Sequence, residues 1–281
     1  MSRERALEHR LRTLSTLEQA IGALRSLSAR HFRAARAPLA SARLYRDEVG
    51  AFLSALEAGR PRGTTANRSG VVLVTADLGL VGDYSARLVR EALDLRAERG
   101  PGPLLCVGRR AVSLLAKSGV VPTSVRPAPA SVAGLSTLLL GLVDELLRLR
   151  HRDELDSLWL VAARFEGAGQ FSPIRVAVLP IEPPAGRPVL PISPYCAARH
   201  VRAVVVREYL YAALYETLLE SLASEHGKRL VVAESARSWL SERIASTRRL
   251  AAALRRETST QEVLEVAAGA RASRRRAGRP R

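Results

Sequence analysis

The chain has 281 residues, of which 47% are hydrophobic and only 4% aromatic, and it carries a formal net charge of +17. This length allows one large domain or two modest ones, and a core with so few aromatic rings must be built mainly from leucine, valine and alanine. The stretch 1–12 is charged throughout, and no apolar run approaches the roughly 20 residues that cross a bilayer, so we expect neither a signal peptide nor a membrane-spanning helix. The two cysteines, Cys106 and Cys196, show neither metal-ligand nor disulfide-framework spacing.

The first block of the chain, 2–57, carries one apolar stripe. Its large apolar residues recur at steps of three and four, beginning with Leu7, Leu11, Leu14, Leu17, Ile21, Leu24 and Leu27. This spacing predicts a long helix, which Pro38 should kink or loosen. Such a helix would be roughly 80 Å long at 1.5 Å per residue. It cannot bury its stripe on a compact domain alone, so it requires a second long helix.

The middle block, 70–194, alternates short apolar runs with helical patterns. The runs at 71–75, 104–107, 158–161 and 176–178 predict buried strands, and helices are expected near 84–99, 109–118 and 131–150. This alternation is typical of a small Rossmann-like α/β domain with a largely parallel sheet. The Pro- and Gly-rich segments 59–70 and 180–194 are expected to join it to the chain ends.

The last block supplies the second long helix. Between Pro194 and Pro280 there is no proline, and apolar residues again step by three and four, which predicts a helix over about 197–268. We expect a mixed α+β and α/β fold in which the N- and C-terminal helices form a long antiparallel coiled coil with the α/β domain inserted between them. The alternative is two ordinary helices in a bundle. The predicted boundaries are 1–58, 70–194, 195–270 and a disordered basic tail at 271–281.

The segment 75–84, TADLGLVGDY, follows the first predicted strand and opens a helix. Glycines there could expose backbone N–H groups to a phosphate, but the Gly-x-x-Gly spacing is one glycine short of a dinucleotide fingerprint and no Walker lysine follows. Asp83 would repel phosphate, whereas it would cap a helix well. We therefore interpret the segment as a tight strand-to-helix turn and expect no cofactor.

The histidines do not indicate a catalytic or metal site. The five are scattered, and no two have metal-ligand spacing. The Glu225-His226 pair is interpreted as a polar step on a helix. We therefore expect no enzymatic activity from this chain.

Several segments resemble the gamma subunit of F-type ATP synthases. Residues 20–35, AIGALRSLSARHFRAA, are similar to the family's N-terminal helix, and the turn resembles Ser-Asp-Arg-Gly-Leu-Cys-Gly-Gly, with Asp77, Gly79, Leu80 and Gly82 matching. Residues 220–226, ESLASEH, are close to the family's ES-x-ASEH motif. Residues 256–266, RETSTQEVLEV, with the following AGA, resemble its last helix. The resemblance spans nearly the whole chain in family order.

The resemblance implies a central-stalk rotor shaft whose two long helices lie inside a ring of alternating alpha and beta subunits. Its α/β domain would form a foot on the c-ring beside the epsilon subunit, at the cytoplasmic face of the bacterial plasma membrane. Chemistry would remain in the beta subunits. By resemblance, the residues that contact the head are Leu24, Arg25, Arg33, Arg256, Thr260 and Glu262. Asp77, Gly79 and Gly82 would form the turn of the foot.

Some positions depart from the family. Glu257 replaces a glutamine in a pair thought to contact an acidic beta-subunit loop, so either Arg255 and Arg256 screen its charge or that loop differs. The chain ending also resembles gamma subunits of the alternative ATPases associated with sodium. The sequence leaves two other functions open: a basic coiled-coil protein that binds nucleic acid, favoured by the charge, and an enzyme with a nucleotide site in the α/β domain.

Overall fold

The computed structural model describes residues 2–57, 68–180 and 197–277 and divides the chain into two compact units. One unit comprises Met1–Arg25 with Ala233–Arg281, and the other comprises Ser26–Val232. Most of the joints predicted at 59–70 and 180–194 lies outside the described residues, as do Cys196 and the end of the predicted tail.

The larger unit contains a five-stranded sheet of order β3-β2-β1-β4-β5. The strands are β1 (Ser69–Val74), β2 (Leu104–Val107), β3 (Ser124–Arg126), β4 (Ser157–Gly167) and β5 (Gln170–Leu179). The first four strands are parallel to their neighbours, and β5 pairs antiparallel with β4. The predicted strands and the largely parallel sheet are confirmed, whereas β3 and the β4–β5 hairpin were not predicted.

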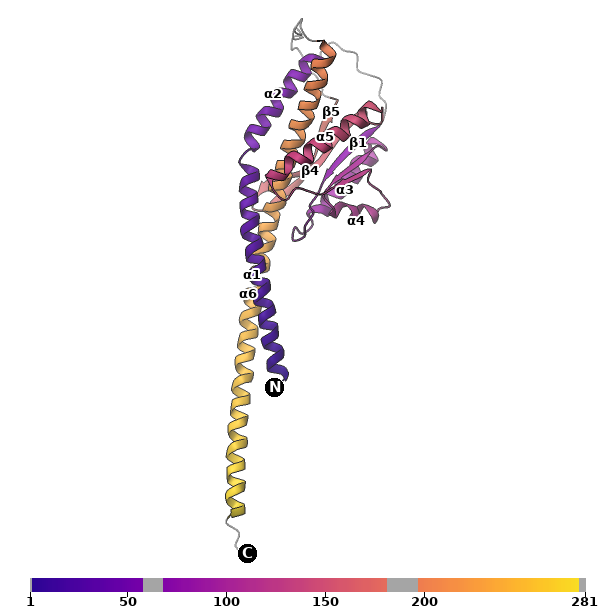
Figure 1. The fold of residues 1–281 in the computed structure, drawn as a ribbon. Coiled ribbons are helices and arrows are strands. Elements are labelled where there is room, and N and C mark those ends of the chain that lie inside the picture. Colours follow the sequence, from indigo (N-terminus) through magenta and orange to yellow (C-terminus); the bar gives the residue numbers. More distant parts are fainter. Residues whose placement is uncertain (1, 58–67, 181–196, 278–281) are drawn as a thin grey trace. The chain divides into compact units, whose positions relative to one another are not determined.

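Helices cover both faces of this sheet (Figure 1). On one face, Val71 and Leu73 of β1 pack with α3 (Tyr84–Arg99) and α4 (Arg110–Ala116). On the other face, Val72 and Val74 pack with α5 (Leu135–His151) and the first half of α6 (Ala198–Ala277). Alternate residues of the strand therefore serve two separate cores, as the period of two requires. The predicted helices are confirmed within a few residues, and a short 3-10 turn, η1 (Val132–Gly134), precedes α5.

The N-terminal block forms two helices, α1 (Ser2–Arg36) and α2 (Leu39–Glu57). The helix is interrupted directly before and at Pro38, as predicted. Within the smaller unit α1 lies along α6, and a small apolar cluster joins them through Leu14, Leu240 and Ile244.

Ion pairs give the direction of this helix pair. The guanidinium of Arg255 contacts Glu4 at 2.7 Å and Glu8 at 2.5 Å, whereas Arg25 contacts Glu234 at 3.1 Å. Early residues of α1 therefore face late residues of α6, so the predicted antiparallel coiled coil is confirmed in this unit.

Helix α6 is 80 residues long and continues to Ala277. The predicted helix end near 268 was therefore too early, and the beginning of the predicted basic tail is helical. Near this end Val263, Leu264 and Val266 are exposed. Among the described ranges we find no helix that combines the length and hydropathy required to cross a bilayer.

Two glycines of α6 differ in their surroundings and test the packing of this helix. A Cβ at Gly227 would lie 2.6 Å from Cε2 of Phe165, whereas one at Gly269 would meet nothing within 4 Å. We expect Gly227→Ala to lower the free energy of unfolding by about 2 kcal/mol, because overpacking displaces β4. Gly269→Ala should cause no loss, since alanine favours a helix over glycine by about 1 kcal/mol. Urea unfolding followed by circular dichroism measures both. Equal effects would contradict the close approach of α6 and β4.

Candidate functional site

The segment 220–226 of α6 supplies hydrogen-bond partners to the backbone of β4 where a neighbouring strand is lacking. Strand β1 pairs with β4 only as far as Val161, so the backbone groups of β4 beyond that residue have no strand partner on that side. The backbone N–H of Ala163 donates to Oγ of Ser221, and its carbonyl accepts from the hydroxyl of Ser224, both at 3.3 Å. These serines therefore satisfy polar groups that burial would otherwise leave unpaired.

A buried carboxylate extends this contact to α2. Glu220, which is 5% exposed, accepts a hydrogen bond from the backbone N–H of Phe165 at 3.1 Å and forms an ion pair with Arg43. One turn earlier, Glu216 contacts Arg43 at 3.2 Å and also pairs with Arg46. Charge-assisted hydrogen bonds of this kind are stronger than neutral ones, so they hold α2, α6 and β4 together.

The arginines of α2 were missed by the sequence reasoning. Glu216 and Glu220 each stand two residues, or about 200°, from the predicted apolar stripe of Leu214 and Leu218. The pattern therefore places them on the solvent face and does not predict basic partners on another helix. Nothing in the sequence indicated that their partners would be Arg43 and Arg46.

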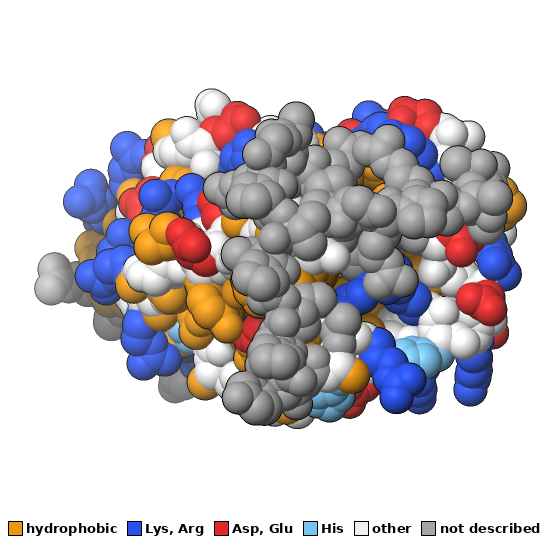
Figure 2. Space-filling model, turned by 90° about the horizontal axis from the view of Figure 1, so that it is seen from above, with side chains coloured by type: hydrophobic (Ala, Val, Ile, Leu, Met, Phe, Trp, Pro, Cys, Tyr) orange, Lys and Arg blue, Asp and Glu red, His pale blue; other side chains and the backbone are white. Residues whose placement is uncertain are grey.

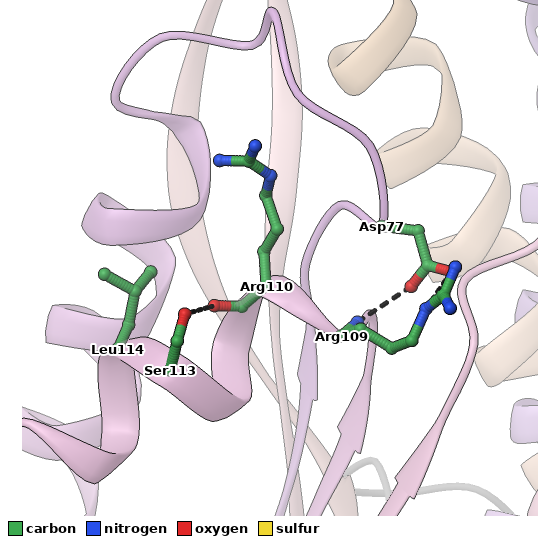
Figure 3. A pocket seen from close by; sticks show the side chains of 5 residues that line it. All are labelled: Asp77, Arg109, Arg110, Ser113 and Leu114. Carbon is green, nitrogen blue, oxygen red and sulfur yellow. Dashed lines mark hydrogen bonds and ion pairs between the residues drawn. The ribbon is translucent and has the colours of Figure 1, made fainter.

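The glycine turn begins with a carboxylate that joins three strand ends. Asp77 accepts hydrogen bonds from the backbone N–H groups of Arg109 at 2.7 Å and Ala128 at 3.1 Å, and it pairs with the guanidinium of Arg109 at 3.0 Å (Figure 3). A pocket of about 500 Å³ opens beside it, and the side chain of Arg110 points away from Asp77. The family-matching aspartate thus serves as a tether between the segments that follow β1, β2 and β3.

The same turn contacts α6. Nε of Arg229 donates to the carbonyl of Gly79 at 3.3 Å, and Nζ of Lys228 lies 3.4 Å from the carboxylate of Asp83. Gly82 has a φ of +59°, and a Cβ there would lie 3.3 Å from Cε of Lys228. The two family-like motifs, far apart in sequence, therefore form one contact, which we call the junction (residues 77–84 and 216–229 with their partners on α2 and β4).

Asp83 does not cap α3 as predicted. Its side chain makes no capping hydrogen bond and instead faces Lys228. Tyr84, the first residue of α3, donates its hydroxyl to the carbonyl of Ser221 at 3.1 Å. Burial raises the pKa of Tyr84 well above its usual value, so the phenol stays neutral. Tertiary contacts with α6 have therefore outweighed local capping.

Glu225 and His226, interpreted as a polar step on a helix, lie on α6 and are buried. Glu225 pairs with Arg229, whose guanidinium also donates to Nδ1 of His226 at 3.2 Å. Burial raises the pKa of Glu225, and the Arg229 charge opposes this shift. The ring of His226 meets that of His31 edge-on at 4.9 Å. Burial, together with the charges of Arg229 and His31, lowers the pKa of His226 to about 4.

The residues predicted to contact a surrounding head are not gathered into one site. In the smaller unit Leu24 is half-buried and Arg25 pairs with Glu234, near the opposite end of the α1–α6 contact from Arg255. The other unit contains Arg33, which is exposed.

The three C-terminal contact residues lie together on α6. Arg256, Thr260 and Glu262 are exposed, and the hydroxyl of Thr260 donates to the carbonyl of Arg256 at 2.8 Å. Arg255 is engaged by Glu4 and Glu8, so it is committed to α1 rather than to screening Glu257.

The Glu220 network should carry a large share of the stability of the larger unit. Glu220→Ala leaves the Phe165 N–H unpaired and removes one partner of Arg43, so we expect a loss of about 3 kcal/mol in unfolding free energy. Glu234→Ala, on the same helix, removes an exposed ion pair and should cost less than about 1 kcal/mol. Urea titration of both variants provides the comparison. A loss for Glu220→Ala as small as the control's would show that this carboxylate is dispensable.

Acid should destabilise the junction through His226. The unfolded imidazole binds its proton near pH 6.5, but the folded one binds it only near pH 4, so the unfolded state holds more protons between these values. Stability should therefore fall by up to about 3 kcal/mol as the pH is lowered through this window. His226→Gln should flatten that part of the profile, whereas His9→Gln, an exposed site, should leave it unchanged. Chemical unfolding at a series of pH values gives the slopes, and parallel profiles for His226→Gln and the unaltered chain would refute the assignment.

Comparison with known proteins bears on the whole chain. A family model described as ATP synthase matches residues 3–272. The chain is 28% identical over 285 residues to the ATP synthase gamma chain of Moorella thermoacetica, covering 96% of this chain and 99% of that one. It is also 28% identical over 297 residues to the ATP synthase gamma chain of a Parafrankia species, covering 95% and 97%.

Solved structures share the fold. A chain from the Euglena gracilis mitochondrial ATP synthase, from a structure of OSCP, F1 and c-ring, has a TM-score of 0.68 at 14% identity, covering 100% of this chain and 97% of that one. A chain of the central stalk and c-ring of the Tetrahymena thermophila enzyme has a TM-score of 0.59 at 20% identity, covering 77% and 99%. The family match covers nearly the whole chain, and the curated relatives that it resembles are gamma chains: the chain belongs to the ATP synthase family.

Proposed function

We propose that this chain is the central rotor shaft of an F-type ATP synthase, which transmits rotation of a c-ring to a catalytic head of alpha and beta subunits. In this role it couples ion flow to the synthesis or hydrolysis of ATP. The junction is the observation that supports the proposal most directly. Torque that enters through the sheet domain must pass into α6, and a contact built of buried, directional hydrogen bonds and ion pairs resists slipping.

The C-terminal end of α6 is suited to lie inside a surrounding ring of protein subunits. Val263, Leu264 and Val266 are 68%, 64% and 74% exposed, although each is a large aliphatic residue. In Figure 1 this end of α6 extends past the N-terminus of α1, with which it shares a compact unit. An exposed apolar helix end is typical of a surface that a partner covers. The ring of alternating alpha and beta subunits would supply that partner.

The chemistry of the proposed complex lies in the beta subunits. The shaft acts by contacting them differently at each angle, and thereby stabilises a different nucleotide state of each one in turn. The net charge of +17 suits an acidic partner surface, and such complementarity favours a specific orientation. The sheet domain would rest on the c-ring beside the epsilon subunit, peripheral to the cytoplasmic face of the bacterial plasma membrane. The relatives give no support to the nucleic-acid alternative.

Charge reversal at Arg256 tests the proposed contact with the head. In the assembled complex, Arg256→Glu should reduce the coupling of ATP turnover to ion pumping by placing a second carboxylate beside Glu257, facing an acidic loop. We expect the isolated variant to remain folded, because Arg256 is exposed. Proton or sodium pumping per ATP hydrolysed, measured in reconstituted vesicles, reports the coupling.

Arg256→Lys is the matched control for this experiment, because it keeps the positive charge and should retain more coupling than the reversal. Unchanged coupling in Arg256→Glu would remove this residue from the contact. The rotor role itself would be overturned if the isolated chain bound and hydrolysed ATP, since a shaft has no nucleotide chemistry of its own.

A further inference from the structure

A basic pocket of about 550 Å³ lies between the C-terminal end of α5 and the first turns of α6. Ten residues line it, and they comprise four arginines, two histidines and four aliphatic residues, with no carboxylate among them. Figure 2 looks down on the end of the larger unit where α6 begins and shows histidine side chains beside those of Lys and Arg. Neither the junction nor the proposed head contacts involve this pocket.

The arginines of this pocket differ in their partners. Arg207 forms an ion pair with Asp144 at 2.9 Å, so its charge is already compensated within the chain. By contrast, Nη1 of Arg150 is buried and has no hydrogen-bond partner within the described part of the chain. A buried donor without a partner is costly, and a bound water or anion can satisfy it. Arg199 is exposed at the mouth of the same pocket.

The N-terminus of α6 strengthens the preference for an anion. Helix α6 begins at Ala198 and has no acidic residue in its first turn, so no side chain of that turn opposes the partial positive charge of its N-terminus. The last turn of α5 carries Arg148, Arg150 and His151. The dipole at the C-terminus of α5 opposes an anion, so the preference rests on the arginine charges and on the N-terminus of α6, both of which bind phosphate.

The aliphatic residues narrow the class of ligand. Val204 is 54% exposed, and Leu147, Ala203 and Val206 line the pocket with it. A free phosphate or an acidic peptide would use only the cations and leave this apolar surface in water. A phosphodiester that carries acyl chains would cover both.

We propose that this pocket binds the headgroup of an anionic phospholipid. The phosphate lies against Arg150 and Arg199 at the start of α6, and the first carbons of the acyl chains lie against Val204. The proposal stands on the chemistry of the pocket and goes beyond the rotor role, so either can fail without the other.

Vesicle binding with a matched charge control tests the proposal. The full chain is mixed with vesicles of phosphatidylcholine alone or with phosphatidylglycerol added, and partitioning is measured by sedimentation. Because the whole chain is basic, Arg150→Gln/Arg199→Gln is compared with Arg248→Gln/Arg249→Gln, which removes the same charge from an exposed stretch of α6. We expect the pocket variant to lose at least tenfold in partitioning to anionic vesicles and the control less than about threefold, because Arg248 and Arg249 line no part of the pocket and contribute only through the general positive charge of the chain.

Two further measurements separate the possible ligands. Val204→Ser should weaken partitioning to anionic vesicles about threefold or more, because it removes the acyl contact and leaves the charge unchanged. Excess inorganic phosphate, or a poly-glutamate peptide, should compete only weakly. Equal losses in the two arginine pairs would overturn the pocket in favour of general charge attraction. Full competition by phosphate or by the peptide, with no effect of Val204→Ser, would overturn the lipid assignment.

Discussion

The structure depends on the hydrogen bonds that side chains of α6 make to the backbone of β4. At this point a helix provides the partners that a neighbouring strand would normally provide. Hydrophobic contact alone is not directional, so an apolar helix on a sheet can rotate or slide at little cost. Ser221, Ser224 and Glu220 prevent this, because each bonds a defined backbone group of Ala163 or Phe165. The angular position of α6 on the sheet is therefore set by hydrogen bonds, while the surrounding apolar cores supply most of the stabilisation.

From this contact the restraints spread in two directions along α6. One turn toward its N-terminus, Glu216 engages α2, and toward its C-terminus, Arg229 engages the carbonyl of Gly79. Few of these groups are open to solvent: Arg229 is 2% exposed and Glu216 is 8% exposed. Screening by salt is weak at such sites, and a buried charged group that loses its partner is left uncompensated. A chain whose proposed task is to carry torque thus places its strongest interactions where sheet, turn and helices meet.

The sequence predicted the elements better than their contacts. Periods of two and of three to four residues located most strands and the long helices, because each element buries one defined face. The short edge strand at 124–126 is barely apolar, and the β4–β5 hairpin carries Pro173 opposite Ala163, so neither gave a clear pattern. Asp83 was assigned a local role that a tertiary partner, Lys228, took over. The motifs at 77–84 and 220–226 were recognised separately, yet nothing local indicates that they touch.

The interruption before α2 has a consequence for changes in chain length. Opposite α6, which is continuous over 80 residues, the N-terminal block is divided at residues 37–38. One residue inserted into α6 would turn every later side chain by about 100° and misalign either the serines on β4 or Arg255 with Glu4. An extra residue at the break enlarges a turn and leaves α1 and α2 each in its own alignment. We therefore expect insertions and deletions to accumulate in the N-terminal block, at its break, and to be selected against in α6.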